Sequence, residues 1–251
     1  MSAHLRHRQP EFIPNWKEER RIIADTIRNH GSPGQKLTIL EAGCGLSWGL
    51  DLGDREFTLT GIDIDQPALD QRLHVKKDLD RAICGDLRTV HLEDGTYDVI
   101  FNSYVMEHIQ GARDVLLRFE RWLKPGGIMI LIIPNRDSVW GFLIRMTPFW
   151  FHIFFKRYVL RDRKAGSPGY GPFRTYYDKV VSRRGIHEFC EERGLVLKAE
   201  YSVGNGRKIW TPAVRAVLSF VTVVISIASF GTLARGQANL MYIIERPLDR
   251  G

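Results

Sequence analysis

Two glycines separated by one residue follow a short apolar run that ends in an acid, a pattern that suits a nucleotide-type ligand. The run and its turn cover residues 38–47 and contain Glu41, Gly43 and Gly45. Glycine lets the backbone approach a ligand closely, and a helix start offers unpaired N–H groups. A second apolar run ends in Asp63, where βαβ nucleotide folds bind ribose hydroxyls. Together these residues predict an adenosine site.

The details of this turn separate two classes of cofactor. A dinucleotide loop of the form G-x-G-x-x-G needs a glycine where the chain has Trp48. Glu41 is a poor neighbour for a pyrophosphate and a good one for a cationic ligand. E-x-G-x-G followed by a strand-end Asp resembles motifs I and II of class I S-adenosylmethionine (SAM) dependent methyltransferases, although Ser47 stands where that family often has glycine. A nicotinamide-dependent reductase is therefore disfavoured.

Two further apolar runs end in polar residues, at Asp86 and at Asn102. The run at 97–103, followed by Glu107 and His108, resembles the D-V-I and E-H pattern of the same family. Leu-Lys-Pro-Gly-Gly at 123–127 resembles its usual turn before the next strand. The resemblance implies that SAM contacts Glu41, Gly43, Cys44, Gly45, Asp63, Ile64, Asp86, Leu87 and Asn102.

The resemblance also implies a role for several of these residues. Glu41 would shape the loop and offset the positive charge of the cofactor, while Asp63 would accept hydrogen bonds from both ribose hydroxyls. Asp86 would meet the adenine amino group, and the Asn102 region would border the methionine end. Cys44 is interpreted as a small residue that fills space in the loop, and not as a nucleophile. We therefore expect the carboxylates at positions 41, 63 and 86 to converge on one cofactor.

His108 is the first candidate for a general base, because imidazole titrates near neutral pH and this residue follows the fourth strand. A shared structural or cofactor-facing role of the Glu-His pair is the alternative. The weaker candidates are His152, Tyr170, Tyr176, Tyr177 and His187. Tyr176 and Tyr177 suit packing, and His187 is expected on a solvated helix face. No H-x-x-x-H or carboxylate cluster suggests a metal site.

The repeated order of strand, helix and strand through residue 133 predicts an α/β fold with a parallel sheet covered on both faces. The resemblance implies a Rossmann-like sheet of seven strands, mostly parallel with the last antiparallel, and apolar helical insertions. We expect one domain over 1–251. Its parts are an N-terminal arm and helix at 1–35, a SAM-binding core at 36–135, an aromatic and basic insertion with a lid at 136–175, and a C-terminal half at 176–251 with an apolar helical insertion at 213–235.

Individual elements follow from local signals. Residues 1–14 read as a loose arm, and Asn15 can cap a helix from Trp16 to about Asn29. A short helix is expected from about Trp48, and another begins at Gln66-Pro67. Further elements are expected as a helix capped by Ser182, a strand at 195–203 and a strand at 239–245.

Net charge is +7, which suits an anionic surface, either nucleic acid or phospholipid. The aromatic residues cluster with aliphatic ones and do not alternate with Lys and Arg as in a nucleic-acid stacking groove. We therefore expect no nucleic-acid partner. Three scattered cysteines suggest reduced thiols in the cytoplasm, and the first twelve residues do not form a secretory signal.

Two apolar segments are additional to the minimal domain that the resemblance implies. Residues 139–155 are rich in aromatics, should be split by Pro148 into two short helices, and precede a basic cluster. They suit either an interfacial anchor on anionic lipid or a buried lid over an apolar substrate.

The second apolar segment, 216–234, carries no charge and is long enough to suggest a membrane-spanning helix. Its hydroxyl residues recur at steps of three and four, which predicts a helix with one polar stripe. Because the strands before and after it must join one sheet, we expect it to lie in the membrane interface, to dip in and return, or to pack on the protein. An ordinary buried helix is the alternative.

The sequence thus predicts a SAM-dependent methyltransferase that methylates an oxygen of an apolar or lipid-like acceptor, in the cytoplasm and peripherally on an anionic membrane. One alternative is a non-catalytic, methyltransferase-like binding module for a membrane partner. Another is a soluble small-molecule methyltransferase with an apolar lid. The oligomeric state stays open.

Overall fold

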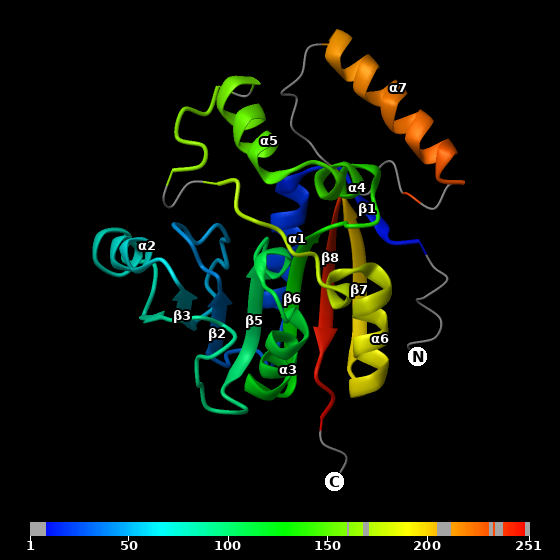
Figure 1. Cartoon of the computed structure of the whole chain (residues 1–251). Coiled ribbons are helices and arrows are strands. Elements are labelled where there is room, and N and C mark those ends of the chain that lie inside the picture. Colours follow the sequence, from blue (N-terminus) through cyan, green and yellow to red (C-terminus); the bar gives the residue numbers. More distant parts are fainter. Residues whose placement is uncertain are drawn as a thin grey trace.

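An eight-stranded sheet organises the molecule, with strand order β1-β7-β8-β6-β5-β2-β3-β4 (Figure 1). The computed structural model describes residues 9–159, 161–167, 171–204, 212–230, 233 and 238–248. The strands are β1 (Glu11–Ile13), β2 (Leu37–Ala42), β3 (Phe57–Asp63), β4 (Arg81–Cys84), β5 (Tyr97–Ser103), β6 (Leu123–Pro134), β7 (Val196–Val203) and β8 (Asn239–Glu245).

The sheet is parallel except at β8, which is antiparallel to both β6 and β7. This confirms the predicted Rossmann-like α/β class with an antiparallel last strand. The carboxyl ends of β2 to β5 therefore lie at one edge, which we call the carboxyl edge. In such sheets ligands bind at this edge.

The sheet has one strand more than predicted, because β1 pairs in parallel with β7. Residues 11–13 therefore do not belong to a loose arm, and that part of the prediction is wrong. Ile13 is buried and lies opposite Val203, so one apolar contact and the backbone ladder hold this short strand. Three residues are too few to show an alternating pattern in the sequence. Residues 1–8 lie outside the described part of the chain.

Helices cover both faces of the sheet. One face carries α1 (Trp16–Arg28) and α2 (Gln66–Asp70), and the other carries α3 (Ala112–Trp122) and α6 (Arg183–Arg193). Asn15 and Ser182 accept hydrogen bonds from backbone N–H groups in the first turns of α1 and α6, as predicted. Pro67 lies in the first turn of α2. Short helical turns also occur, among them the π-helix η2 (Gln71–Lys76) and the 3-10 helices η3 (Met106–His108) and η5 (Lys179–Val181).

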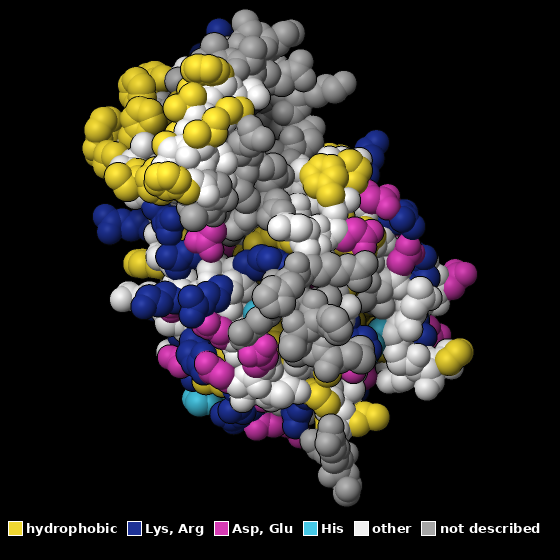
Figure 2. All heavy atoms as spheres, turned by 90° about the vertical axis from the view of Figure 1, so that its right-hand side faces the viewer, with side chains coloured by type: hydrophobic (Ala, Val, Ile, Leu, Met, Phe, Trp, Pro, Cys, Tyr) yellow, Lys and Arg dark blue, Asp and Glu magenta, His cyan; other side chains and the backbone are white. Residues whose placement is uncertain are grey.

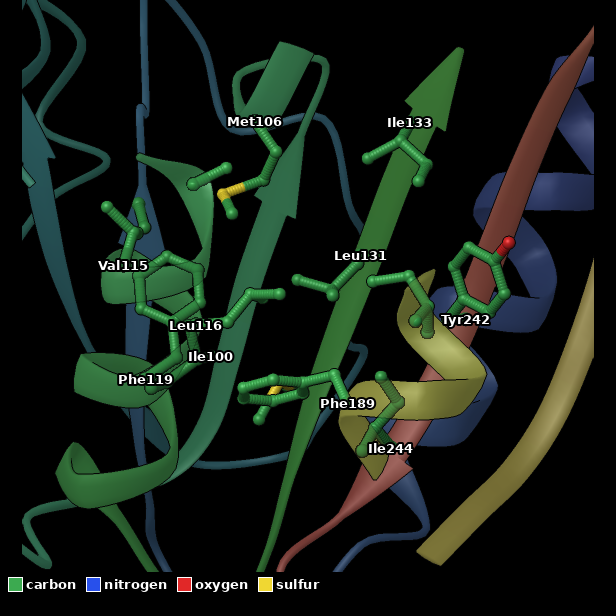
Figure 3. Packing of buried hydrophobic residues seen from close by; sticks show 14 of the residues in the cluster. Ile100, Met106, Val115, Leu116, Phe119, Leu131, Ile133, Phe189, Tyr242 and Ile244 are labelled. Atoms are coloured by element: carbon green, nitrogen blue, oxygen red, sulfur yellow. The ribbon is translucent and has the colours of Figure 1, made fainter. Parts of the chain in front are cut away.

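The core on the α3 and α6 face is built from large side chains of both helices and the central strands (Figure 3). Phe119 of α3 and Phe189 of α6 are fully buried there, against Leu131 of β6 and Ile244 of β8. This packing joins residues far apart in the sequence, from Leu40 of β2 to Ile244 of β8.

No helix follows the turn after β2, so the prediction of a short helix from about Trp48 is wrong. Residues 43–56 form turns and irregular backbone. Gly49 and Gly53 weaken helix formation here because glycine loses much backbone entropy on folding. Asp51 also accepts a hydrogen bond from the backbone N–H of Gly53, a local turn that competes with a helix.

Three further helices lie beyond the carboxyl edge: α4 (Val139–Met146), α5 (Phe149–Phe154) and α7 (Pro212–Ala228) (Figure 1). Pro148 separates α4 from α5 as predicted, and the π-helix η4 (Phe155–Val159) continues α5. Among the described residues, no helix is long and apolar enough to cross a membrane.

Candidate functional site

The site is centred on Asp63, at the end of β3. One oxygen of its carboxylate accepts a hydrogen bond from Gly45 N at 2.8 Å, and the other accepts one from Asp65 N at 3.0 Å. Each carboxylate oxygen has a further lone pair. Asp63 therefore orders the turn after β2 and can still accept hydrogen bonds from a ligand.

The two glycines of this turn have different reasons to be glycine. Both have positive φ, +74° at Gly43 and +52° at Gly45, which disfavours other residues. A Cβ at Gly43 would lie 2.3 Å from Cγ2 of Val105, so close packing excludes a side chain. A Cβ at Gly45 would meet nothing within 4 Å, so the space beside that backbone is open to a ligand.

Glu41 is buried and pairs with Arg72 of η2. Its carboxylate accepts a hydrogen bond from Nη1 of Arg72 at 2.6 Å, and the same nitrogen donates to the Cys44 carbonyl at 2.9 Å. Burial raises the pKa of Glu41 to about 7, while Arg72 acts in the opposite direction. Glu41 therefore holds the turn through Arg72, and its charge is offset by protein before any cationic ligand binds.

Asp86 lies at the same edge but is paired elsewhere. Its carboxylate accepts hydrogen bonds from the Arg88 guanidinium, which lowers the pKa of Asp86. The next residue, Leu87, is buried. The structure thus brings Glu41 and Asp63 to the turn at 43–45. Asp86 lies two residues after Cys84, the β4 residue that pairs with Asp63, and it forms an ion pair with Arg88.

Asn102 offers an unsatisfied acceptor near the end of β5. Its amide nitrogen donates to the Ala42 carbonyl at 2.8 Å, while Oδ1 is buried and has no hydrogen-bond partner in the described structure. Buried polar atoms without partners are rare in native proteins. Ile64, after Asp63, is 77% exposed and offers an apolar surface. A carboxylate, an open glycine turn, an orphaned amide oxygen and an apolar face fit an adenosine-bearing, amino-acid-containing cofactor.

Cys44 is a buried free cysteine in the turn. Burial raises the pKa of its thiol to about 12, and the Glu41 carboxylate adds to this effect. The thiol therefore stays protonated at neutral pH, which agrees with a filler residue and not with a nucleophile.

His108 is held by the segment that follows α5. Its Nδ1 lies 2.7 Å from the Arg174 carbonyl, so this nitrogen carries a proton and donates it, and Nε2 has the free lone pair in the neutral ring. Burial lowers the pKa of His108, which favours the neutral form. Nε2 lies 3.7 Å from Oε1 of Glu107, and in the neutral ring it can accept a proton.

Glu107 is absent from the predicted site residues, although it is the better-buried member of the pair. It is 3% exposed, Oε2 lacks a partner in the described structure, and burial raises its pKa to about 7. The Glu107 carbonyl accepts hydrogen bonds from the backbone N–H groups of Tyr176 and Tyr177. Glu107 and His108 thus both bind the segment 174–177, which crosses the carboxyl edge. The E-H pattern at residues 107–108 was the sequence signal that could have indicated Glu107.

The weaker base candidates are dispersed. His152 bonds to Thr147 in the α4–α5 connection, Tyr176 is exposed and Tyr177 is buried. His187 is buried with Nε2 3.3 Å from a Glu200 carboxylate oxygen, so the prediction of a solvated face is wrong. The side of α6 that carries His187 packs against β7 instead of facing water. Tyr170 lies outside the described residues. Groups of three or more potential metal ligands are absent from the described part of the chain.

Comparisons with known proteins agree with this site. A family model described as a methyltransferase domain matches residues 40–131, which include the carboxyl ends of β2 to β5. A probable S-adenosylmethionine-dependent methyltransferase of Mycolicibacterium smegmatis is 34% identical over 101 residues, 39% of this chain and 38% of that protein. The match therefore spans less than half of that relative's length.

A second relative is similar over a longer stretch. The ubiquinone biosynthesis O-methyltransferase of Rickettsia typhi is 27% identical over 189 residues, 70% of this chain and 67% of that protein. Among solved structures, a SAM-dependent methyltransferase of Methanosarcina mazei has a TM-score of 0.56 at 14% identity and covers 89% of this chain and 97% of that chain. At this identity the structural likeness concerns the fold.

Proposed function

Because the chain carries a class I S-adenosylmethionine-dependent methyltransferase domain, we propose that it transfers a methyl group from SAM to an oxygen of an apolar, lipid-like acceptor at a membrane surface. The observation that carries the acceptor and membrane parts is an exposed apolar surface on α5 and α7, beyond the carboxyl edge where Asp63 lies. The O-methyltransferase from Rickettsia supports an oxygen acceptor.

The first part of this surface is aromatic. Trp150 and Phe154 of α5 and Tyr158 of η4 are exposed, Trp150 to 66%. Soluble proteins rarely expose contiguous apolar patches without a binding role. Trp and Tyr are typical of the membrane interface, where an apolar body meets a polar rim.

The second part is α7, whose apolar face is turned to solvent. Phe220, Val224 and Ile227 recur at steps of four and three and are exposed, Phe220 to 70% and Ile227 to 71%. Thr222, on another face, is buried, and its hydroxyl donates to the Ser219 carbonyl. A helix on a water-exposed surface normally shows the opposite arrangement. The exposed face of α7 is therefore suited to an apolar environment.

Basic residues lie next to the aromatic part. Residues 139–167 contain six Lys or Arg and one acid. Arg161, Arg163 and Lys164 are exposed. Figure 2 shows hydrophobic side chains gathered at one end of the molecule with Lys and Arg side chains below them. Each basic residue near an anionic bilayer contributes about 1 kcal/mol of attraction. This arrangement favours an anionic lipid surface as the partner.

The chemistry requires alignment of donor and acceptor, exclusion of water and removal of the acceptor proton. When bound, SAM supplies an electrophilic methyl group on a sulfonium. We assign Asp63 to the ribose hydroxyls, the backbone of Gly43 and Gly45 to the methionine part, and Asn102 Oδ1 to the cofactor ammonium. His108 Nε2 is the proposed proton acceptor, and the segment 174–177 covers the edge.

Lipid extracts incubated with labelled SAM and the protein, analysed by mass spectrometry, test the activity. We expect a methylated lipid-soluble product with the label on oxygen. Label on nitrogen would correct the acceptor atom, and a labelled water-soluble product alone would favour the soluble alternative. The non-catalytic alternative requires that no labelled product forms while the protein still binds liposomes.

Flotation with phosphatidylglycerol liposomes tests the surface. We expect the wild type to float and the variant Trp150→Ser/Phe154→Ser/Ile227→Ser to remain below, while Leu248→Ser, an exposed leucine elsewhere, floats normally. Equal flotation of all three proteins would contradict the role of α5 and α7. If none floats and the wild type alone elutes as a dimer, a second copy covers this face and the membrane proposal fails.

A further inference from the structure

Arg72 of η2 is the largest fully buried side chain of the described structure, and its contacts converge on the turn after β2. Nη1 contacts the Glu41 carboxylate at 2.6 Å and the Cys44 carbonyl at 2.9 Å. Nε donates to Asp78 at 3.0 Å. A buried guanidinium with partners on three sides fixes the distance between η2 and the turn.

The segment 72–78 contacts the turn at further points. Asp78 accepts a hydrogen bond from Trp48 N at 3.2 Å, and Nζ of Lys76 donates to the Leu46 carbonyl. Residues 43–56 contain no helix of their own. The turn is therefore ordered by side chains of the next βα unit, in the place where helical hydrogen bonds would otherwise order it.

We propose that Arg72 is a positioning residue for SAM, because it holds residues 44–48 in the binding geometry and neutralises Glu41 beneath them. This inference rests on the proposed function, since it concerns the cofactor site of that activity. Arg72 acts through the turn and does not itself touch the reacting atoms.

The electrostatic surroundings of Glu41 give this role a measurable consequence. The groups that interact with its carboxylate are Arg72, Asp78, Asp63 and the Cys44 thiol, and Arg72 is the cation among them. Removing one partner of a buried ion pair leaves the other charge uncompensated. Without Arg72, Glu41 would be unpaired when ionised and better tolerated when protonated, so cofactor binding would weaken as pH rises.

Isothermal titration with S-adenosylhomocysteine at pH 6.5 and pH 8.5 tests the inference. We compare wild type with Arg72→Met, Arg72→Lys, Glu41→Gln and the double variant Glu41→Gln/Arg72→Met. Arg113→Met is the matched control, because Arg113 also forms an ion pair, with Glu192, but on the exposed surface. Coupling energies between contacting residues correspond to changes of about tenfold in affinity.

We expect Arg72→Met to weaken binding about tenfold at pH 8.5 and less at pH 6.5. The double variant should bind equally at both pH values, because the titrating carboxyl is gone. Arg72→Lys should give an intermediate affinity, since one ammonium cannot reach three partners. Arg113→Met should bind as the wild type does.

Wild-type affinity of Arg72→Met at both pH values would overturn the inference. An equal loss at both pH values, unaffected by Glu41→Gln, would reduce Arg72 to a general stabilising residue and also overturn it. If circular dichroism shows that Arg72→Met does not fold, the affinities of Arg72→Lys and the double variant test the inference. Both variants should then bind S-adenosylhomocysteine more weakly than Glu41→Gln does. Affinities equal to that of Glu41→Gln would refute the positioning role of Arg72. A wild type that binds no S-adenosylhomocysteine rejects the proposed function itself.

Discussion

The cofactor side and the acceptor side of this molecule are built on opposite principles. Around Asp63 and Glu41, the backbone is fixed by one half-buried and one buried carboxylate, an internal arginine and the strands of the sheet. On α5 and α7, large apolar side chains such as Trp150 and Phe220 face outward, while Thr222 of α7 is buried. A site for an invariant donor can be preformed, whereas a surface for an apolar acceptor gains its stabilisation only when something apolar covers it. Four predictions probe this difference.

The largest effect should come from the centre of the cofactor side. Asp63→Ala removes two hydrogen bonds that hold Gly45 and Asp65 and the proposed ribose acceptor, so S-adenosylhomocysteine binding should weaken by 100-fold or more, about 3 kcal/mol. Isothermal titration measures this. Asp94→Ala, an exposed acid paired with Arg121, is the control. Similar affinities of the two variants would remove Asp63 from the site.

His108→Gln tests the boundary between the two sides. Loss of a general base should lower kcat by about 100-fold while S-adenosylhomocysteine affinity stays within about twofold. Single-turnover assays with labelled SAM give the rate of the chemical step. A weaker affinity with unchanged kcat would show that His108 serves the cofactor side, as a structural partner of the Arg174 carbonyl.

Glu107 should make stability depend on pH. Because burial raises its folded-state pKa to about 7, the folded state holds a proton that the unfolded chain releases near pH 4.5. The contribution is fully present below about pH 4.5 and is lost as pH rises through about 7, on the order of 3 kcal/mol. Urea unfolding from pH 5 to 8 should show a decline that Glu107→Gln flattens. A parallel decline in both proteins would assign it to other groups.

The smallest effect should be on the acceptor side. Phe220→Ser should change the free energy of unfolding by less than about 0.5 kcal/mol, because the side chain is already exposed. Phe119→Leu in the core is the contrast and should destabilise by more than 1 kcal/mol. Thermal unfolding of both variants without lipid measures these two changes in stability. A large loss in Phe220→Ser would mean that α7 packs through its apolar face.

Much of the fold was predictable because its signals are local. Asn15, Ser182 and Pro67 start helices through contacts within one turn, and Pro148 divides α4 from α5 because it cannot continue a helix. The acids at strand ends likewise indicate the carboxyl edge, because each directly follows a short apolar run in the sequence. By contrast, β1 and the irregular backbone after Gly45 depend on neighbours distant in the chain, so local propensity was misleading there.

The sequence by itself determined the α/β class and the position of the acids at the ends of successive strands, since apolar runs and turn residues encode these directly. The motifs at those strand ends carry the resemblance to methyltransferases, and residues 40–131 match a methyltransferase domain. Only the tertiary structure decided which charges meet. Arg72 lies 31 residues from Glu41, and the Glu107 carbonyl accepts hydrogen bonds from a segment about 70 residues away. Such pairings follow from the packing of strands and turns, and no local pattern specifies them.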